Sequence, residues 1–147
     1  MVATVYDFLL FVHVLFAFAL VAAVTTFWAL ILSTQPGRML LTPRGAMLLG
    51  RVGGMTVAVS GFGVLVFGVW LAIYIDGYEL WDGWILASLV LWLVSTIVGI
   101  RSGRLYERAA EPDADAVVLR RQGLMLQVIS SAAILFVLIL MIFKPGA

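Results

Sequence analysis

The sequence predicts an all-α membrane protein whose four transmembrane helices form an up-down-up-down antiparallel bundle. Of its 147 residues, 64% are hydrophobic and 12% are charged, whereas a soluble domain is about half apolar and about a quarter charged. A helix needs about 20 apolar residues to cross a bilayer, and most of the chain is taken up by four such stretches, at residues 6–32, 54–75, 84–100 and 124–143. Short connections leave consecutive helices antiparallel. We therefore treat residues 1–147 as one domain.

The first stretch resembles a secretory signal only in its position. No Lys or Arg precedes Tyr6, and the apolar run that follows is much longer than the apolar core of a cleaved signal. We expect a retained first helix, with the whole chain as the mature protein.

The second stretch has a helix-start signal and a row of small residues. Thr42 is placed to cap a helix whose first residue is Pro43, and breaks are expected at Gln35-Pro36-Gly37 and Asp76-Gly77. In lipid, helices associate through close backbone approach at small residues. The small residues of this helix lie three, four or seven positions apart on one predicted packing face: Gly50, Gly54, Ala58, Gly61 and Gly68.

The third stretch has a similar packing face, and the fourth has a shorter one. Ser88, Trp92, Ser95, Gly99 and Gly103 share one side of the third helix. In the fourth helix a small patch is formed by Gln127, Ser130 and Ser131. Pro112 and the aspartates after it predict a cytoplasmic helix start that continues into this fourth span.

The loop charges predict the orientation in the membrane. Three arginines separate the first two stretches and five separate the last two, which together make eight of the nine basic residues. The positive-inside rule places both loops in the cytoplasm and both termini outside, in a bacterial plasma (inner) membrane crossed several times. An aromatic belt is expected at the outer ends, comprising Tyr6, Tyr74, Tyr78, Trp81 and Trp84. The net charge of +1 indicates no nucleic-acid partner.

His13 is the only histidine and lies within the first span. An ionisable residue in a membrane helix is a candidate functional residue. Counting from Tyr6 places it about 10 Å into the hydrocarbon layer, level with Gly68, Trp92 and Phe136. That surrounding has room for a flat ligand such as haem b but no second axial donor, which leaves a five-coordinate haem or one shared between two copies. The alternative is an imidazole hydrogen-bonded to a backbone carbonyl or a serine of the third helix.

Other chemistry is sparse. The chain has no cysteine, and no serine-histidine-acid set can form around a histidine in the membrane. The outer acids, Asp76, Glu79 and Asp82 with Asp7, are expected to be solvated rather than to hold a metal. The sequence therefore favours a non-catalytic subunit that packs into a homo-oligomer or a larger membrane complex. The alternative is a haem- or porphyrin-binding redox protein with His13 as the axial ligand.

Short motifs resemble a known family. They are Phe8-Leu-Leu-Phe-Val-His13-Val-Leu-Phe-Ala17 in the first helix, Gly68-Val-Trp70-Leu-Ala72, Trp84-Ile-Leu-Ala87 and Leu91-Trp92. Over most of the chain this pattern is similar to the bacterial membrane family of domain of unknown function 2269, which implies four spans and no particular activity.

A looser similarity reaches two other groups, the copper-resistance D type proteins and the four-helix bacterial protoporphyrinogen oxidases. Their helix-one histidine implies haem binding at His13. Two features depart from the patterns of these families. Leu20 and Ala22 stand where the domain 2269 family tends to have tryptophan and glycine, and the sole lysine, Lys144, does not match the oxidases' transmembrane lysine.

Overall fold

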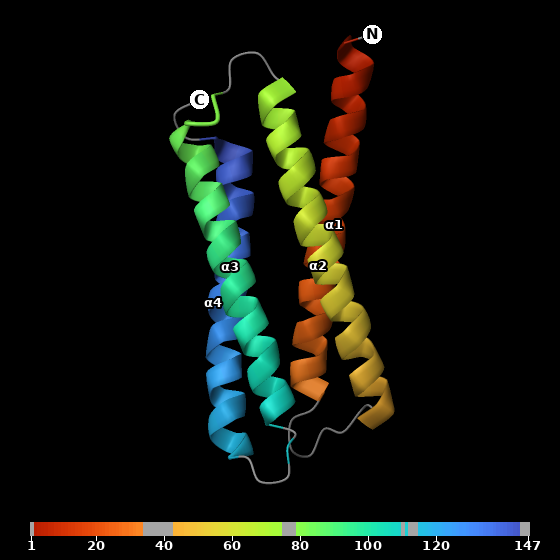
Figure 1. Cartoon of the computed structure of the whole chain (residues 1–147), viewed down its shortest axis with the longest axis vertical. Coiled ribbons are helices and arrows are strands. Elements are labelled where there is room, and N and C mark those ends of the chain that lie inside the picture. Colours follow the sequence, from red (N-terminus) through yellow and green to blue (C-terminus); the bar gives the residue numbers. More distant parts are fainter. Residues whose placement is uncertain (1, 34–42, 75–78, 110, 112–114, 145–147) are drawn as a thin grey trace. The chain divides into compact units, whose positions relative to one another are not determined.

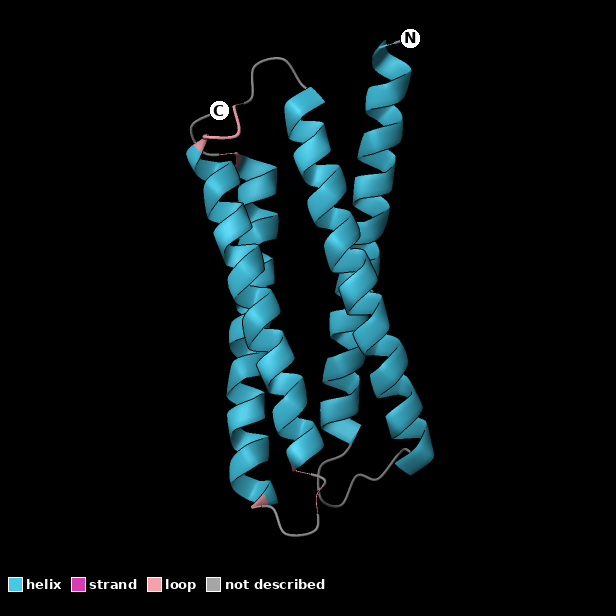
Figure 2. Ribbon diagram, viewed as in Figure 1, coloured by secondary structure: helices cyan, strands magenta, loops and turns pink. Residues whose placement is uncertain are grey.

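Four α-helices make up nearly all of the described chain. The computed structural model describes residues 2–33, 43–74, 79–109, 111 and 115–144. Within these ranges Figure 2 shows only helix and short loop segments, with no strand. The all-α fold class is confirmed. The helices are α1 (Val2–Ser33), α2 (Pro43–Tyr74), α3 (Gly83–Arg108) and α4 (Ala116–Phe143).

Each helix is long and apolar enough to cross a membrane, so the chain is a multi-pass membrane protein by length and composition. The candidate spans are Val5–Ser33, Leu48–Tyr74, Gly83–Arg108 and Ala116–Phe143. The predicted stretches fall inside the four helices, except for Ile75, which lies outside the described residues. The helices continue past the apolar runs into arginine-bearing turns, because a helix satisfies its own backbone hydrogen bonds in lipid and in water alike.

The helix ends agree with the local signals where these are described. α2 begins at Pro43 as predicted. Asp115 caps α4, since its Oδ1 accepts a hydrogen bond from the Val118 backbone N–H at 3.3 Å. Lys144, the residue that follows α4, has a φ of 40°. The remaining predicted signals, at Thr42, 35–37, 76–77 and 112–113, lie outside the described residues.

The chain divides into two compact units, Met1–Glu79 and Leu80–Ala147. Each unit is a helical hairpin, one built from α1 and α2 and the other from α3 and α4 (Figure 1). Both hairpins are antiparallel. In the first, His13 meets Val64 and Phe27 meets Gly53, and in the second, Ser95 meets Ser130 and Ser102 meets Gly123. The hairpins are described one at a time below.

Burial is reversed relative to a water-soluble protein. Ser60, Ser88 and Ser102 are the largest side chains that are less than 2% exposed, whereas many large apolar side chains are open, among them Phe18 at 71%. A surface of this kind is suited to lipid, and small buried residues let helix backbones approach closely.

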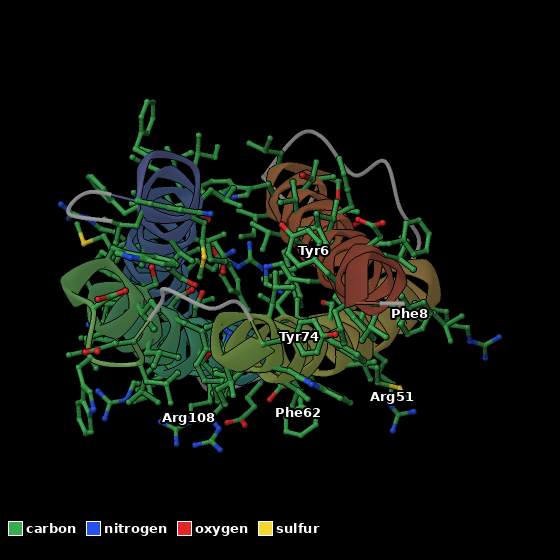
Figure 3. All side chains as sticks on the ribbon, turned by 90° about the horizontal axis from the view of Figure 1, so that it is seen from above. Tyr6, Phe8, Arg51, Phe62, Tyr74 and Arg108 are labelled. Carbon is green, nitrogen blue, oxygen red and sulfur yellow. The ribbon has the colours of Figure 1, made fainter. Side chains whose placement is uncertain are left out.

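The predicted aromatic belt is only partly described. Tyr6 and Tyr74 lie at the same end of the α1–α2 hairpin (Figure 3). Trp81 is 80% exposed, and Tyr78 lies outside the described residues. Trp84 is buried, and the Lys144 Nζ lies 5.9 Å from the centre of its ring.

Candidate functional site

His13 joins α1 to α2 through a hydrogen bond. Its Nδ1 lies 3.1 Å from the carbonyl oxygen of Val64, and the side chain is half-buried. A carbonyl oxygen can only accept, so Nδ1 carries the hydrogen and donates it. In the neutral imidazole the other ring nitrogen, Nε2, then keeps a lone pair. Of the two hydrogen-bond partners expected for His13, the structure contains the backbone carbonyl.

Gly68 gives the imidazole access to that carbonyl. A Cβ placed on Gly68 would lie 2.9 Å from His13 Cε1 and 3.3 Å from Nδ1. Gly68 is one helical turn beyond Val64, so any side chain there would stand next to the carbonyl to which the ring binds. Gly68 was predicted to lie at the same depth as His13, and in the structure the two residues are in direct contact. Trp92 and Phe136, predicted for the same level, belong to α3 and α4.

The rest of the α1–α2 seam consists of aromatic rings packed on glycines. A Cβ on Gly63 would lie 2.5 Å from the Phe16 ring, and one on Gly53 would lie 3.5 Å from the Phe27 ring. The Phe16 ring also stacks on Phe67, with centroids 5.7 Å apart. Close backbone approach and dispersion, rather than polar bonds, hold most of this seam.

The α3–α4 seam contains a reciprocal serine pair. Ser95 Oγ donates to the Ser130 carbonyl at 3.0 Å, Ser130 Oγ donates to the Ser95 carbonyl at 2.9 Å, and the two hydroxyl oxygens lie 3.0 Å apart. Ser102 Oγ donates to the Gly123 carbonyl at 2.8 Å. All four residues are buried. In this hairpin polar groups bond across the helix interface.

The predicted packing residues have different surroundings. Gly68 meets His13, Ser95 bonds to Ser130, and a Cβ on Gly99 would lie 3.1 Å from the Ser130 hydroxyl oxygen. Ser88 is buried, but its hydroxyl bonds to the Trp84 carbonyl of its own helix at 2.7 Å.

On α2 the predicted row of small residues is largely separate from the contact with α1. A Cβ on Gly50 or Gly54 would meet nothing within 4 Å. Ala58 is exposed, whereas Gly61 is buried.

Several small residues of the seams were missed by the sequence reasoning, among them Gly53, Gly63, Ser102 and Gly123. The signal for the two α2 glycines was the depth of their aromatic partners. In an antiparallel hairpin the numbers of facing residues have a nearly constant sum, which pairs Phe27 with Gly53 and Phe16 with Gly63. The prediction used only the spacing of small residues within one helix, so it did not consider which residues of the partner helix lie at the same depth.

The described residues hold little reactive chemistry. They contain no group of three or more His, Cys, Asp or Glu side chains placed to hold a metal ion. Of the outer acids, Asp7 and Glu79 are exposed and Asp82 is half-buried, while Asp76 lies outside the described residues. His13 with its free Nε2 is the main candidate for a ligand-binding side chain.

Comparisons with protein-family models, with curated protein sequences and with solved structures give no match.

Proposed function

We propose that this chain is a non-catalytic subunit of a membrane assembly, either a homo-oligomer or an accessory subunit of a larger complex. The observation that carries the proposal is the open small-residue face of α2, formed by Gly50, Gly54 and Ala58. A Cβ on either glycine would meet nothing within 4 Å, and Ala58 is exposed. The i, i+4, i+8 spacing places the three residues on one side of the helix, where another helix can approach closely.

This face is distinct from the α2 side that packs on α1. At about 100° per residue, Gly54 lies about 100° around the helix from Gly53, which contacts α1 through Phe27. The α1–α2 hairpin therefore forms without using the open face, which is left for a further helix. The scarcity of reactive groups among the described residues supports a packing role over a catalytic one.

We further propose that the assembly lies in a bacterial plasma membrane with the α1–α2 and α3–α4 connections in the cytoplasm and both termini outside. The distribution of arginine supports this orientation, since eight of the nine basic residues lie in the α1–α2 connection or in the helix ends that flank the two connections. The proposal also includes membership of the domain 2269 family, which rests on the motifs around His13 and Gly68.

Crosslinking from the open face tests the proposal. Because the chain has no cysteine, Gly54→Cys and Val52→Cys each provide one attachment point for a photoreactive crosslinker in native membranes. Val52 is exposed at nearly the same depth but lies about 200° around the helix. We expect the Gly54 variant to give one discrete protein adduct, either twice the chain mass or larger, and the Val52 variant to give none.

The mass in mild detergent provides a second measurement for the unmodified chain. We expect a stable assembly larger than the 16.0 kDa monomer. A monomeric particle without a co-purifying partner, together with equal crosslinking from both positions, would contradict the proposal.

A second candidate function is binding of haem b or another porphyrin, with His13 as axial ligand. The hydrogen bond from Nδ1 to the Val64 carbonyl favours it, because metal-ligating histidines usually donate their other ring N–H to a carbonyl or carboxylate. This bond fixes the tautomer and leaves Nε2 to bind iron. The resemblance of the His13 motif to the helix-one histidine of the protoporphyrinogen oxidases supports the same candidate.

An absorption spectrum tests the second candidate. Protein expressed with ample haem should show a Soret band, and His13→Ala should remove it. Gly68→Ala is a useful companion, because it crowds the imidazole without removing Nε2 and should shift or weaken the band. A colourless preparation, or a band unchanged in His13→Ala, would exclude His13 ligation.

A further inference from the structure

One exposed side of α2 has arginines at one end and apolar side chains along the rest. We call this side the basic-apolar face, and it consists of Arg44, Leu48, Arg51, Met55, Val59, Phe62 and Val66. All seven side chains are exposed, and at about 100° per residue they fall within about 80° of each other around the helix. Figure 3 shows Arg51 and Phe62 on the same side of α2.

The apolar part of the face is hollowed along the α1–α2 seam. Two adjoining depressions, of about 400 Å³ and 270 Å³, share Phe16 of α1 and Val59 of α2 among their lining residues. Small residues, including Ala19, Ser60 and Gly63, line the groove between the larger side chains. From Met55 to Phe67 the groove spans twelve residues, or about 18 Å at the helical rise. That length is close to one leaflet, about half of a 30 Å hydrocarbon core.

The basic part of the face has no acid nearby in the sequence. No Asp or Glu occurs between Asp7 and Asp76, while Arg38, Arg44 and Arg51 fall in that interval. The corresponding end of the α3–α4 hairpin differs, because four acids lie among the five arginines between Arg101 and Arg121: Glu107, Glu111, Asp113 and Asp115. Arg51 lies one turn from Met55, where the groove begins, and Arg44 lies about two turns farther. Two positively charged side chains thus stand at the polar end of an apolar groove.

We infer that the basic-apolar face binds an anionic phospholipid, with its phosphate at Arg51 and Arg44 and one acyl chain in the groove beside Phe16 and Val59. Arginine binds phosphate oxygens through several donors, and basic residues at a membrane surface attract anionic lipid. The groove supplies the length and apolar lining for the chain. The arginines stand at the polar end of the apolar groove, just as the phosphate of a phospholipid stands at the end of its acyl chains.

A second copy of the chain is a poorer occupant of this face. Copies inserted in the same orientation and packed through it would bring Arg44 and Arg51 near the same residues of the neighbour, and like charges repel. The proposed assembly face at Gly50 and Gly54 lies to one side, since Gly54 is about 100° from Met55. Its third residue, Ala58, also lines the larger depression, so a packed helix and the lipid would be neighbours there. Lipid binding is tested separately from assembly, because the variants below leave Gly50, Gly54 and Ala58 unchanged.

Native mass spectrometry of the intact chain in nonionic detergent tests the inference. The probes are phosphatidylglycerol and phosphatidylcholine with the same acyl chains. We expect tighter binding of phosphatidylglycerol. Arg51→Gln with Arg44→Gln should remove that preference, at about fivefold in affinity for each arginine. The charge-matched control, Arg120→Gln with Arg121→Gln, removes two exposed arginines from α4 and should keep it.

Filling the groove tests the acyl-chain part. Val59→Trp places a large ring over both depressions and should weaken binding of both lipids. Val90→Trp, at an exposed position of α3, should leave binding unchanged. Val66→Trp, confined to the larger depression, provides a second variant if Val59→Trp elutes as aggregate.

The negative outcomes are equally specific. Equal binding of the two lipids by the unmodified chain would overturn the inference. So would an equal loss in the α4 control, or unchanged binding in both groove variants. Soluble glycerophosphoglycerol, the headgroup alone, should bind far more weakly than the lipid, and equal binding would show that the groove takes no acyl chain.

Discussion

The two hairpins meet the same physical requirement with different side chains. In α1–α2, aromatic rings lie over glycines, with Phe16 on Gly63 and Phe27 on Gly53. In α3–α4, serine hydroxyls donate across the seam to backbone carbonyls of the facing helix. Since lipid is as apolar as a leucine side chain, exclusion of water contributes little to either seam.

The comparison shows two ways to gain affinity between helices in a membrane. Ring-on-glycine packing depends on shape, so it is sensitive to one added methyl group. The serine pair depends on hydrogen bonds that a helix in lipid cannot replace with water. The bond from His13 to Val64 is a polar contact in the α1–α2 seam, and it too requires a glycine, Gly68, to admit the ring.

The largest expected effect is that of Gly63→Ala, which tests the shape-dependent seam. Its new Cβ would lie 2.5 Å from the Phe16 ring, so a helix must move or the ring must turn away. Overpacking of this kind typically costs about 1–3 kcal/mol. The measurement is reversible unfolding in mixed micelles followed by circular dichroism.

Gly54→Ala is the matched control for that measurement. It makes the same substitution on the same helix with no neighbour within 4 Å, and the greater helix propensity of alanine is common to both variants. Adding Phe16→Leu to Gly63→Ala should recover part of the loss. Equal stability of the two alanine variants would show that the Phe16–Gly63 contact does not hold the seam.

A smaller effect is expected for Ser130→Ala, which tests the polar seam. The change removes the bond that Ser130 donates to the Ser95 carbonyl and the contact between the two hydroxyls. Interhelical hydrogen bonds in membranes average about 0.6 kcal/mol, so a loss of about 1 kcal/mol is expected.

A double-mutant cycle with Ser95→Ala isolates the pair. A coupling free energy distinct from zero is expected because each hydroxyl bonds to the other residue. Additive losses would mean that the two serines act separately, which would break the proposed contrast between the hairpins.

Much of the fold could be predicted from the sequence because it depends on local and compositional signals. Four apolar runs give four helices, Pro43 marks the start of α2, and Asp115 caps α4. These features need only the length of a bilayer and the chemistry of helix ends.

The helix-helix contacts were less predictable, because small residues occur on several sides of α2. The spacing of Gly50, Gly54 and Ala58 is as regular as a packing face requires, yet α1 contacts Gly53 and Gly63, which lie off the predicted row, together with Gly68, which lies on it. Which side of a helix is used depends on the partner's side chains at matching depth. For His13, the sequence left a carbonyl or a serine as its partner, and the crossing of α1 with α2 provides the Val64 carbonyl.

The smallest effect is expected for Ser88→Ala, which tests whether a buried serine stabilises the hairpin when its hydroxyl does not bond to the other helix. Ser88 is 2% exposed and shares a predicted packing face with Ser95. Its hydroxyl, however, donates to the Trp84 carbonyl of α3 itself, whereas Ser95 bonds to α4. A hydroxyl bonded one turn back does not join helices and slightly disfavours the straight helix. Unfolding stability should therefore change by less than about 0.5 kcal/mol. If Ser88→Ala costs as much as Ser130→Ala under the same conditions, burial of a serine, rather than its bond across the seam, is what stabilises the α3–α4 hairpin.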